Sequence, residues 1–256
     1  MEFWQQIKDQ FRGVTNPGKG GSKDNLCFWE VDMHSHLVPG IDDGVQTDEQ
    51  ALVCLKQLSE WGIKKVITTP HVSRDTFPNS SAVLRAGQDQ LQALITEHNV
   101  PIQVEVAAEY LLDDFFPDLI VQDDLLSFGK ERYVLFETGW SSAPFQLESI
   151  IFRLQTHGYT PILAHPERYS YYHDDEKSLQ HLHEAGCLFQ LNWLSLTGAY
   201  GSKVRKQALE LLRHHSVDFL GSDIHHSASL SKYKAVFTAS EFDLFRQQPL
   251  RNQSLL

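Results

Sequence analysis

The sequence predicts a parallel α/β fold closed into a barrel of seven strands. Short apolar, β-branched runs alternate along the chain with segments of helical period, which is typical of repeated β-then-α units. Several of these runs are apolar almost throughout, as strands buried on both faces are. No glycine-rich phosphate loop follows the first run, and this favours a closed barrel over an open doubly wound sheet.

The seven expected strands are spaced regularly, with a helix expected between neighbours. A capping box at Thr47-Asp48-Glu49-Gln50 begins the first helix, and Gly62 ends it. Further helical periods cover residues 84–95, 147–154, 179–182 and 204–212. Since no long linker separates the units, residues 27–256 are expected to form one domain. The strands are expected at 28–33, 64–69, 102–108, 133–137, 160–164, 187–192 and 217–222.

Residues 1–26 form an extension with a different pattern. Phe3, Trp4, Ile7 and Phe11 lie on one helical face, and a linker rich in glycine follows at residues 16–22. The pattern fits a short helix packed on the main domain, and it also fits a docking element for a partner or a membrane surface. The sequence leaves both interpretations open.

Composition excludes several classes of protein and of partner. With 256 residues, 41% hydrophobic and 21% charged, the chain has the composition of a globular protein. Its 22 Lys and Arg against 33 Asp and Glu give a net charge of −11, which argues against nucleic acid as a partner. No apolar run approaches the roughly 20 residues of a membrane-spanning helix. The three scattered cysteines indicate no disulfide framework and favour a cytoplasmic location.

A pair of histidines follows the first expected strand. His34 and His36 are two residues apart, so on an extended segment both side chains project to the same side and can bind one ion. His181 and His183 have the same spacing but lie in a helical segment, where they face different directions. The first pair is therefore the candidate metal-binding pair.

Further His, Glu and Asp residues follow the other expected strands, and Asp42-Asp43 follows the first. In a parallel barrel these strand ends converge on one face, where active sites are built. Their nitrogen and oxygen atoms suit Zn, Mn or Fe, and their number implies two or three divalent ions. The remaining histidines are not expected to bind metal: His226 should point away from its neighbour, a candidate ligand, and solvation is expected for His98, His157, His173, His181, His183, His214 and His215. The candidate ligands are His71, Glu109, Glu137, His165, Asp223 and His225.

The motifs VDMHSHLVPGIDDG, TTPH, AAEY, YVLFE, AHPERY and GSDIH occur in this order within residues 28–230. They resemble the polymerase and histidinol phosphatase (PHP) superfamily, and in particular its bacterial tyrosine-protein phosphatases linked to capsule and exopolysaccharide synthesis. The resemblance implies a distorted, TIM-like, seven-stranded (β/α) barrel with its metal site at the carboxyl ends of the strands. Residues 1–27 are not covered by it.

The resemblance also implies site residues and a partner. Arg168 would contact the substrate phosphate, and the substrate would be phosphotyrosine in the tail of a bacterial tyrosine kinase. A metal-bridging hydroxide would be the nucleophile. Asp42 is an alternative to Asp43, since that loop aligns loosely. The implied ligand groups are His34, His36, Glu109 and Asp223 for one ion, Glu109, Glu137 and His165 for a second, and Asp43, His71 and His225 for a third.

Alternative functions are distinguished by particular residues. A cysteine-based phosphatase is excluded, because no cysteine has an arginine six positions on. An amidohydrolase would carry a lysine where Glu137 ends the fourth strand. A small-molecule phosphatase, for histidinol phosphate for example, would share the ligands and differ only in its rim loops. A barrel without activity would lack ligands, yet every position is filled.

Five aromatic residues are expected at the rim of the barrel, where they would receive an aromatic leaving group. They are Phe77, Trp140, Tyr169, Tyr171 and Tyr172.

Overall fold

The strands of the protein form two parallel sheets in the computed structural model, which describes residues 26–256. The expected apolar face of Phe3, Trp4, Ile7 and Phe11 and the linker at 16–22 lie outside the described residues. All pairings within both sheets are parallel. One sheet has the order β1(Val31–Asp32), β2(Lys65–Thr68), β4(Gln103–Val106), and the other the order β3(His71–Val72), β5(Glu109–Leu111), β6(Tyr133–Glu137), β7(Thr160–Ala164), β8(Leu188–Asn192), β9(Phe219–Gly221).

The seven expected strands are all present, but the structure does not confirm a single seven-stranded barrel. Two expected strands are followed within a few residues by a further short strand, β3 after β2 and β5 after β4. Pro70 lies at the first break, where it has no N–H to donate to a ladder, and the backbone N–H of Thr69 bonds instead to the carbonyl of Ser35 at 2.7 Å. The ladder between β2 and β4 stops at this point and resumes between β3 and β5 with the same offset between partners, so the interruption divides one continuous pairing between two sheets.

The two sheets curl so that the first and last strands come together. The N–H of Asp223 donates to the carbonyl of His34 at 2.7 Å, and the N–H of His36 donates to the carbonyl of Ile224 at 2.9 Å. Ser35 and Ile224 form an isolated parallel bridge between these segments. The segment after β1 thus lies beside the segment after β9, which brings the candidate ligands of both into one place.

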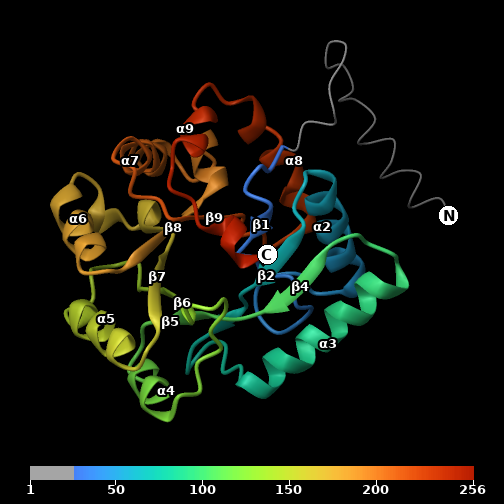
Figure 1. Ribbon diagram of the computed structural model, residues 1–256, viewed down its shortest axis with the longest axis horizontal. Helices are drawn as coiled ribbons and strands as arrows, with labels where there is room; N and C mark the ends of the chain where they lie inside the picture. The colour runs from blue at the N-terminus through green and yellow to red at the C-terminus, as the bar shows by residue number, and fades with distance from the viewer. Residues whose placement is uncertain (1–25) are drawn as a thin grey trace.

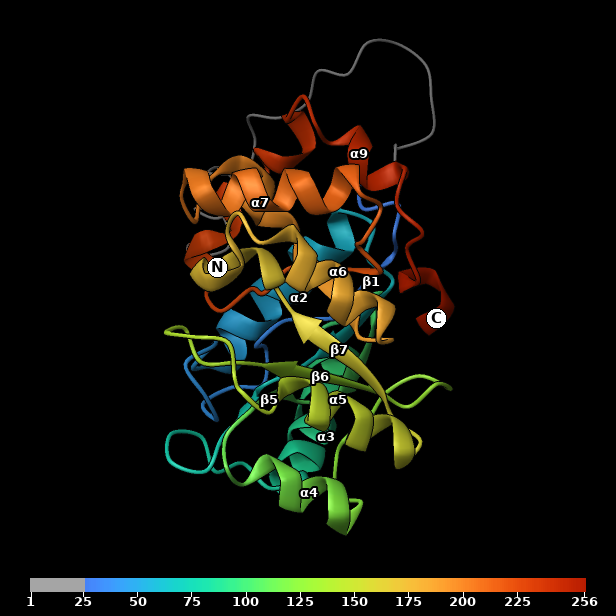
Figure 2. The same ribbon diagram turned by 90° about the vertical axis from the view of Figure 1, so that its left-hand side faces the viewer.

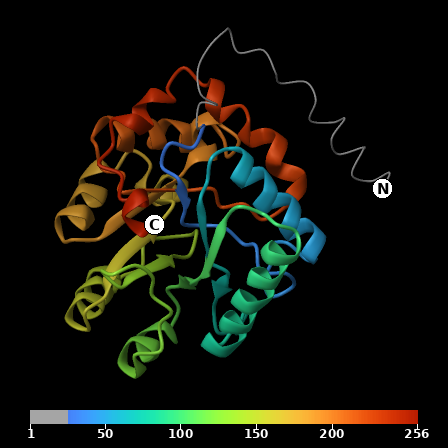
Figure 3. The same cartoon turned by 45° about the vertical axis from the view of Figure 1, so that its right-hand side comes forward.

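Helices surround the strands on the outside (Figure 1). The side chain of Thr47 accepts from the N–H of Gln50, so the predicted cap of the first helix is confirmed. Figure 3 shows α2 and α3 side by side, and Figure 2 shows α4 and α7 toward opposite ends of the molecule. Among the described residues none of the helices is both long and apolar enough to cross a membrane. The helices are α2(Asp48–Glu60), α3(Ser81–Glu97), α4(Phe116–Gln122), α5(Leu147–Thr156), α6(Glu176–Glu184), α7(Ser202–Arg213), α8(Leu230–Tyr233) and α9(Asp243–Arg246).

A small apolar core fills the inside of the curled sheets and closes their amino ends. Met33, Leu135 and Phe219 are fully buried there, together with Leu255 from the C-terminal segment. That segment is held by Asn252, whose side-chain amide donates to the carbonyls of Val31 at 2.8 Å and Leu220 at 2.7 Å. With the amino ends of the strands closed in this way, the carboxyl ends are left to build the polar site.

Candidate metal centre

Four of the candidate ligands face a common point at the carboxyl ends of the strands. His34 Nε2 lies 3.3 Å from His36 Nε2 and 3.2 Å from Glu109 Oε2. Asp223 Oδ1 lies 3.5 Å from both imidazole nitrogens. An ion with bonds of about 2.0–2.2 Å in tetrahedral geometry separates its ligand atoms by roughly 3.4 Å. The donor atoms therefore have the spacing that one ion requires.

Glu109 reaches a second group with its other oxygen. Its Oε1 lies 3.0 Å from His165 Nε2, and both side chains are buried. His165 and Asp223, each next to the end of a strand, have positive φ angles of 35° and 55°. The left-handed conformation is uncommon outside glycine and is found at functional sites, where it aims a side chain that a regular strand would direct elsewhere.

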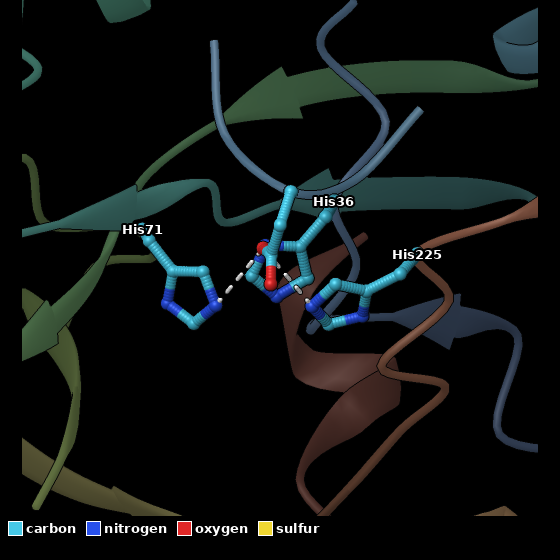
Figure 4. Close-up of side chains that lie close together, drawn as sticks. His36, His71 and His225 are labelled. Carbon is cyan, nitrogen blue, oxygen red and sulfur yellow. Dashed lines mark ion pairs between the residues drawn. The ribbon is translucent and has the colours of Figure 1, made fainter. Parts of the chain in front are cut away.

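The third group lies on the more exposed side of the centre. Asp43 Oδ1 is 3.5 Å from His71 Nε2 and 3.6 Å from His225 Nε2. Figure 4 shows the imidazole rings of His36, His71 and His225 gathered around one point, with dashed lines for the ion pairs of His71 and His225. His71 Nδ1 lies 3.2 Å from Glu137 Oε1. Glu137 thus lies in one group with His71 and Glu109, whereas the resemblance implied that Glu137 and His165 share an ion.

Asp42 and Asp43 have different surroundings, although they are neighbours in the sequence. Asp42 is buried, and its Oδ2 accepts hydrogen bonds from His36 Nδ1 at 2.7 Å and from the N–H of His71 at 3.0 Å. Burial alone would raise the pKa of Asp42, but the bond and charge of His36 lower it to about 2. The Asp43 side chain is 59% exposed and faces the third group. Asp42 therefore contacts a candidate ligand through a buried hydrogen bond, and Asp43 faces the third group from the solvent side.

The carboxylates of the metal-free centre are ionised and hold protons on the neighbouring imidazoles. Burial would raise the pKa of Glu109, yet the charges of His34 and His71 hold it well below its usual range. Asp223 is affected in the same way: burial opposes ionisation, and His34 and His36 outweigh it and lower the pKa. Burial opposes a charge on His34, but Glu109 and Asp223 raise its pKa to about 9, whereas burial lowers the pKa of His225 to about 4. A metal ion binds ionised carboxylates and neutral imidazoles, so an ion at this centre would replace the imidazole protons as the partner of the carboxylates.

Two buried atoms at the centre have no hydrogen-bond partner among the described residues. Glu109 Oε2 is one, although the imidazole nitrogens of His34, His36 and His71 lie 3.2–3.4 Å from it, and His165 Nδ1 is the other. A buried unsatisfied polar atom is costly and calls for an explanation. A divalent ion between Glu109 and the imidazoles would satisfy the oxygen, so the residues present fit a metal centre.

Arg168 lies beside this centre, in the short 3-10 helix η1(Pro166–Arg168) that follows β7. Its Nη1 donates to Asp223 Oδ2 at 2.8 Å. The guanidinium lies between the rings of Trp140 and Tyr200, 4.8 and 4.6 Å from their centroids. Two aromatic faces and one carboxylate therefore hold the guanidinium next to the candidate ligands.

A family model described as "Capsular polysaccharide synthesis, CpsB/CapC" matches residues 30–233, which include every candidate ligand. The chain belongs to the CpsB/CapC family. It is 29% identical over 195 residues to the tyrosine-protein phosphatase YwqE of Bacillus subtilis, covering 76% of this chain and 77% of that protein. It is 27% identical over 195 residues to the putative tyrosine-protein phosphatase CapC of Staphylococcus aureus, covering 76% of each. The resemblance drawn from the motifs is thereby confirmed.

The fold of this CpsB/CapC chain is also similar to a solved one. A chain from the crystal structures of YwqE from Bacillus subtilis and CpsB from Streptococcus pneumoniae, described as metal-dependent tyrosine phosphatases, superposes with a TM-score of 0.74. The two are 26% identical, and the match covers 86% of this chain and 96% of that one. The curled α/β arrangement is therefore one that the family shares.

The expected rim aromatics of the chain fall into two classes. Tyr169 and Tyr172 are buried and pack in the interior. Phe77 and Trp140 remain accessible, and each stacks on a candidate ligand: Phe77 on His71 at 5.5 Å and Trp140 on His165 at 5.8 Å between ring centroids. The expected fifth aromatic, Tyr171, is partly buried. Trp140, 49% exposed, is the most accessible of the set.

Most histidines outside the centre lie in solvent as predicted, with two exceptions. His183 Nε2 lies 2.9 Å from Asp218 Oδ2, and His173 Nε2 lies 2.9 Å from the carbonyl of Glu167, so both are half-buried and bonded. The exposed ones are His98, His157, His181, His214, His215 and His226.

The sequence analysis missed two buried amides on β8, Gln190 and Asn192. Both are completely buried beside the candidate ligands and bonded to them. A signal was present in the sequence: they are the polar residues at alternate positions of the otherwise apolar strand Leu188–Asn192. Residues two apart on a strand face the same side, and this side is the metal centre.

Proposed function

We propose that the chain is a metal-dependent phosphomonoesterase that hydrolyses phosphotyrosine in a protein substrate. The observation that carries the proposal is the convergence of the Glu109 and Asp223 carboxylates on the imidazole nitrogens of His34 and His36 at 3.2–3.5 Å, with Arg168 beside them. Its relatives YwqE and CapC are named tyrosine-protein phosphatases, which favours a protein substrate over a small metabolite such as histidinol phosphate.

We propose two or three divalent ions, of Mn, Fe or Zn, at the three ligand groups. When bound, such ions would activate water near neutral pH and neutralise charge on the phosphoryl oxygens. Glu109 supports more than one ion, because its two oxygens face different groups. We propose Asp43, with His71 and His225, as the ligands of the outermost ion, and Glu137 as a further ligand beside His71.

Arg168 would bind the phosphate. Its Nη1 is occupied by Asp223, but a guanidinium has five N–H donors in a planar fork, so the others remain for two phosphate oxygens. The rings of Trp140 and Tyr200 restrict the orientation of the planar guanidinium. This lowers the conformational entropy that Arg168 loses when it binds the substrate. Arg168 would thus orient the phosphoryl group for attack by water and bear part of its charge.

The leaving group would lie against Trp140. In the reaction a water oxygen bonds to phosphorus, the bond from phosphorus to the phenolic oxygen breaks, and tyrosine leaves. Phosphotyrosine places its phosphate about one aromatic ring farther from the peptide backbone than phosphoserine does. A recessed centre with an exposed aromatic side chain at its mouth suits the longer residue.

We propose the tail of a tyrosine kinase of polysaccharide synthesis as the substrate, since the family is described by capsular polysaccharide synthesis. The net charge of −11 would repel an acidic segment at long range, so recognition would depend on short-range contacts with the ions, Arg168 and Trp140. Three free cysteines fit a reducing compartment, and we propose that the enzyme works in the cytoplasm.

The test is a comparison of peptides on the full chain loaded with Mn²⁺. We expect hydrolysis of a phosphotyrosyl peptide with a higher kcat/KM than that of the matching phosphoseryl peptide, and loss of both activities with a chelator. Arg168→Ala should lower both. If histidinol phosphate is hydrolysed with a far higher kcat/KM than any phosphotyrosyl peptide, the proposed substrate is wrong.

A further inference from the structure

Strand β8 contributes no candidate ligand, yet its two buried amides contact three of them. Gln190 Oε1 accepts from His34 Nδ1 at 2.7 Å and from the backbone N–H of His165 at 3.2 Å. Gln190 Nε2 donates to Asn192 Oδ1 at 2.9 Å, and Asn192 Nδ2 donates to Asp223 Oδ2 at 2.7 Å. The two side chains therefore connect ligands that follow three different strands.

One backbone N–H group, that of His165, determines the direction of the hydrogen bonds that Gln190 makes. The N–H of His165 can only donate, so the Gln190 atom facing it must be the carbonyl oxygen. The same oxygen faces His34, and an oxygen acceptor requires that His34 Nδ1 carry the proton. The Nε2 atom of a neutral His34 then has a free lone pair, directed at the point shared with His36 and Glu109.

We propose that Gln190 and Asn192 are positioning residues that prepare the centre for metal: Gln190 holds His34 in the Nδ1–H tautomer, and Asn192 holds Asp223 with Oδ1 facing inward. The proposal deepens the proposed function and rests on it for the purpose of the metal. Asp223 Oδ2 is bonded to Asn192 and Arg168, which leaves Oδ1 for the ion.

The partner of His34 is a neutral amide and not a carboxylate, and the charges around His34 explain why. His36 has the carboxylate of Asp42 on its Nδ1, whereas His34 has the uncharged Gln190. Glu109 and Asp223 already bring negative charge to within 3.5 Å of the His34 imidazole. An amide selects the tautomer without adding another buried charge that would need its own counter-ion.

The neighbouring strand leaves room for this contact. A Cβ on Gly221 of β9 would lie 2.6 Å from His34 Cβ and 2.7 Å from Gln190 Nε2. Real Cβ atoms are essentially never that close to a neighbour. Glycine at this position therefore leaves space for the His34 side chain and the Gln190 amide to approach each other. Both β8, through Gln190, and β9, through Gly221, thus favour the hydrogen bond between Gln190 and His34.

The experiment measures Mn²⁺ binding by calorimetry on the full chain after chelator treatment. Gln190→Met keeps the length and apolar volume of the side chain and removes the acceptor. We expect an affinity about 10- to 100-fold lower than that of the wild type, the usual effect of losing such an outer partner of a ligand. Gln190→Glu keeps an acceptor for both donors but adds a buried charge and removes the donor to Asn192 Oδ1, so its affinity should lie between that of the wild type and that of Gln190→Met.

Gln248→Leu is the matched control. Gln248 is also buried, and its Nε2 donates to the carbonyls of Leu212 and Leu244, away from the centre. Its loss should lower the stability of the fold and leave Mn²⁺ affinity unchanged. If Gln190→Met binds Mn²⁺ as the wild type does, or if both variants lose affinity equally, the positioning role is refuted.

Asn192→Leu provides a second measurement, should Gln190→Met fail to fold. It removes the bond to Asp223 Oδ2 but leaves the one from Arg168, so we expect a smaller loss of affinity, by roughly 3- to 10-fold. Wild-type affinity in this variant would refute the role of Asn192. Since affinity is measured without substrate, the absence of phosphatase activity in the wild type would refute the proposed function and not this one.

Discussion

Replacing Asp42 by alanine should destabilise the metal-free protein, whereas replacing Asp43 by alanine should leave its stability almost unchanged. Asp42 is buried and accepts three hydrogen bonds, from His36 Nδ1 and from the N–H groups of Gly44 and His71. Asp43 is 59% exposed and has only distant contacts, at 3.5 Å to His71 and 3.6 Å to His225. We therefore expect Asp42 to stabilise the fold without metal, and Asp43 to contribute to stability only when an ion is bound.

The expected loss of unfolding free energy in Asp42→Ala follows from the three hydrogen-bond donors that lose their acceptor. Asp42→Ala orphans three donors at a buried site, each worth about 1–3 kcal/mol, so we expect a loss of about 3–5 kcal/mol after partial relaxation. The pKa of Asp42, lowered from 3.8 to about 2, is alone worth about 2 kcal/mol. A depressed pKa stabilises the fold above pH 3.8, and this contribution is lost as the pH falls through about 2. At pH 7 it is therefore fully present.

Urea unfolding at pH 7, with and without Mn²⁺, separates the two roles. In chelator, Asp43→Ala should unfold within about 0.5 kcal/mol of the wild type, as an exposed residue does. With Mn²⁺ added, the wild type gains stability by mass action, about 2.7 kcal/mol when the free ion is at 100 times its Kd, and Asp43→Ala should gain less. The assignment is refuted if Asp43→Ala unfolds as easily as Asp42→Ala in chelator, or if Asp42→Ala costs nothing.

Three further outcomes are expected. Alkylating reagents should leave the activity of the native enzyme intact, because all three cysteines are buried and burial raises the pKa of each thiol; loss of activity with unchanged metal content would contradict this. Glu109→Ala should lose bound metal and activity together in metal analysis, whereas the exposed His181→Ala should lose neither. Trp140→Ala should lower kcat/KM for a phosphotyrosyl peptide by roughly 3- to 30-fold, the worth of one aromatic contact, and the replacement of another exposed aromatic residue, Phe152→Ala, should not. Equal effects of Trp140→Ala and Phe152→Ala would exclude a specific ring contact.

Local features of the fold were readable from the sequence because they depend on neighbours in the chain. The cap at Thr47 is formed with Gln50, three residues away, and the structure confirms it. The seven apolar runs became strands, and several of them, such as β8, are buried on both faces, whereas β4 alternates between buried and more exposed residues. The division into two sheets was not readable, because it depends on where the pairing between two segments far apart in the sequence stops after β2 and β4 and resumes at β3 and β5.

The sequence by itself determined that candidate metal ligands would gather at the strand ends, since His, Glu and Asp after parallel strands converge wherever those strands align. Only the tertiary structure decided the role of each residue. Asp42 and Asp43 are equivalent in the sequence and differ in burial, and Gln190 acquires a role only because the fold brings it to His34, 156 positions away. The alternation of polar residues on β8 indicated that they share one side of the strand, but the long-range hydrogen bonds that they make are a property of the packed chain.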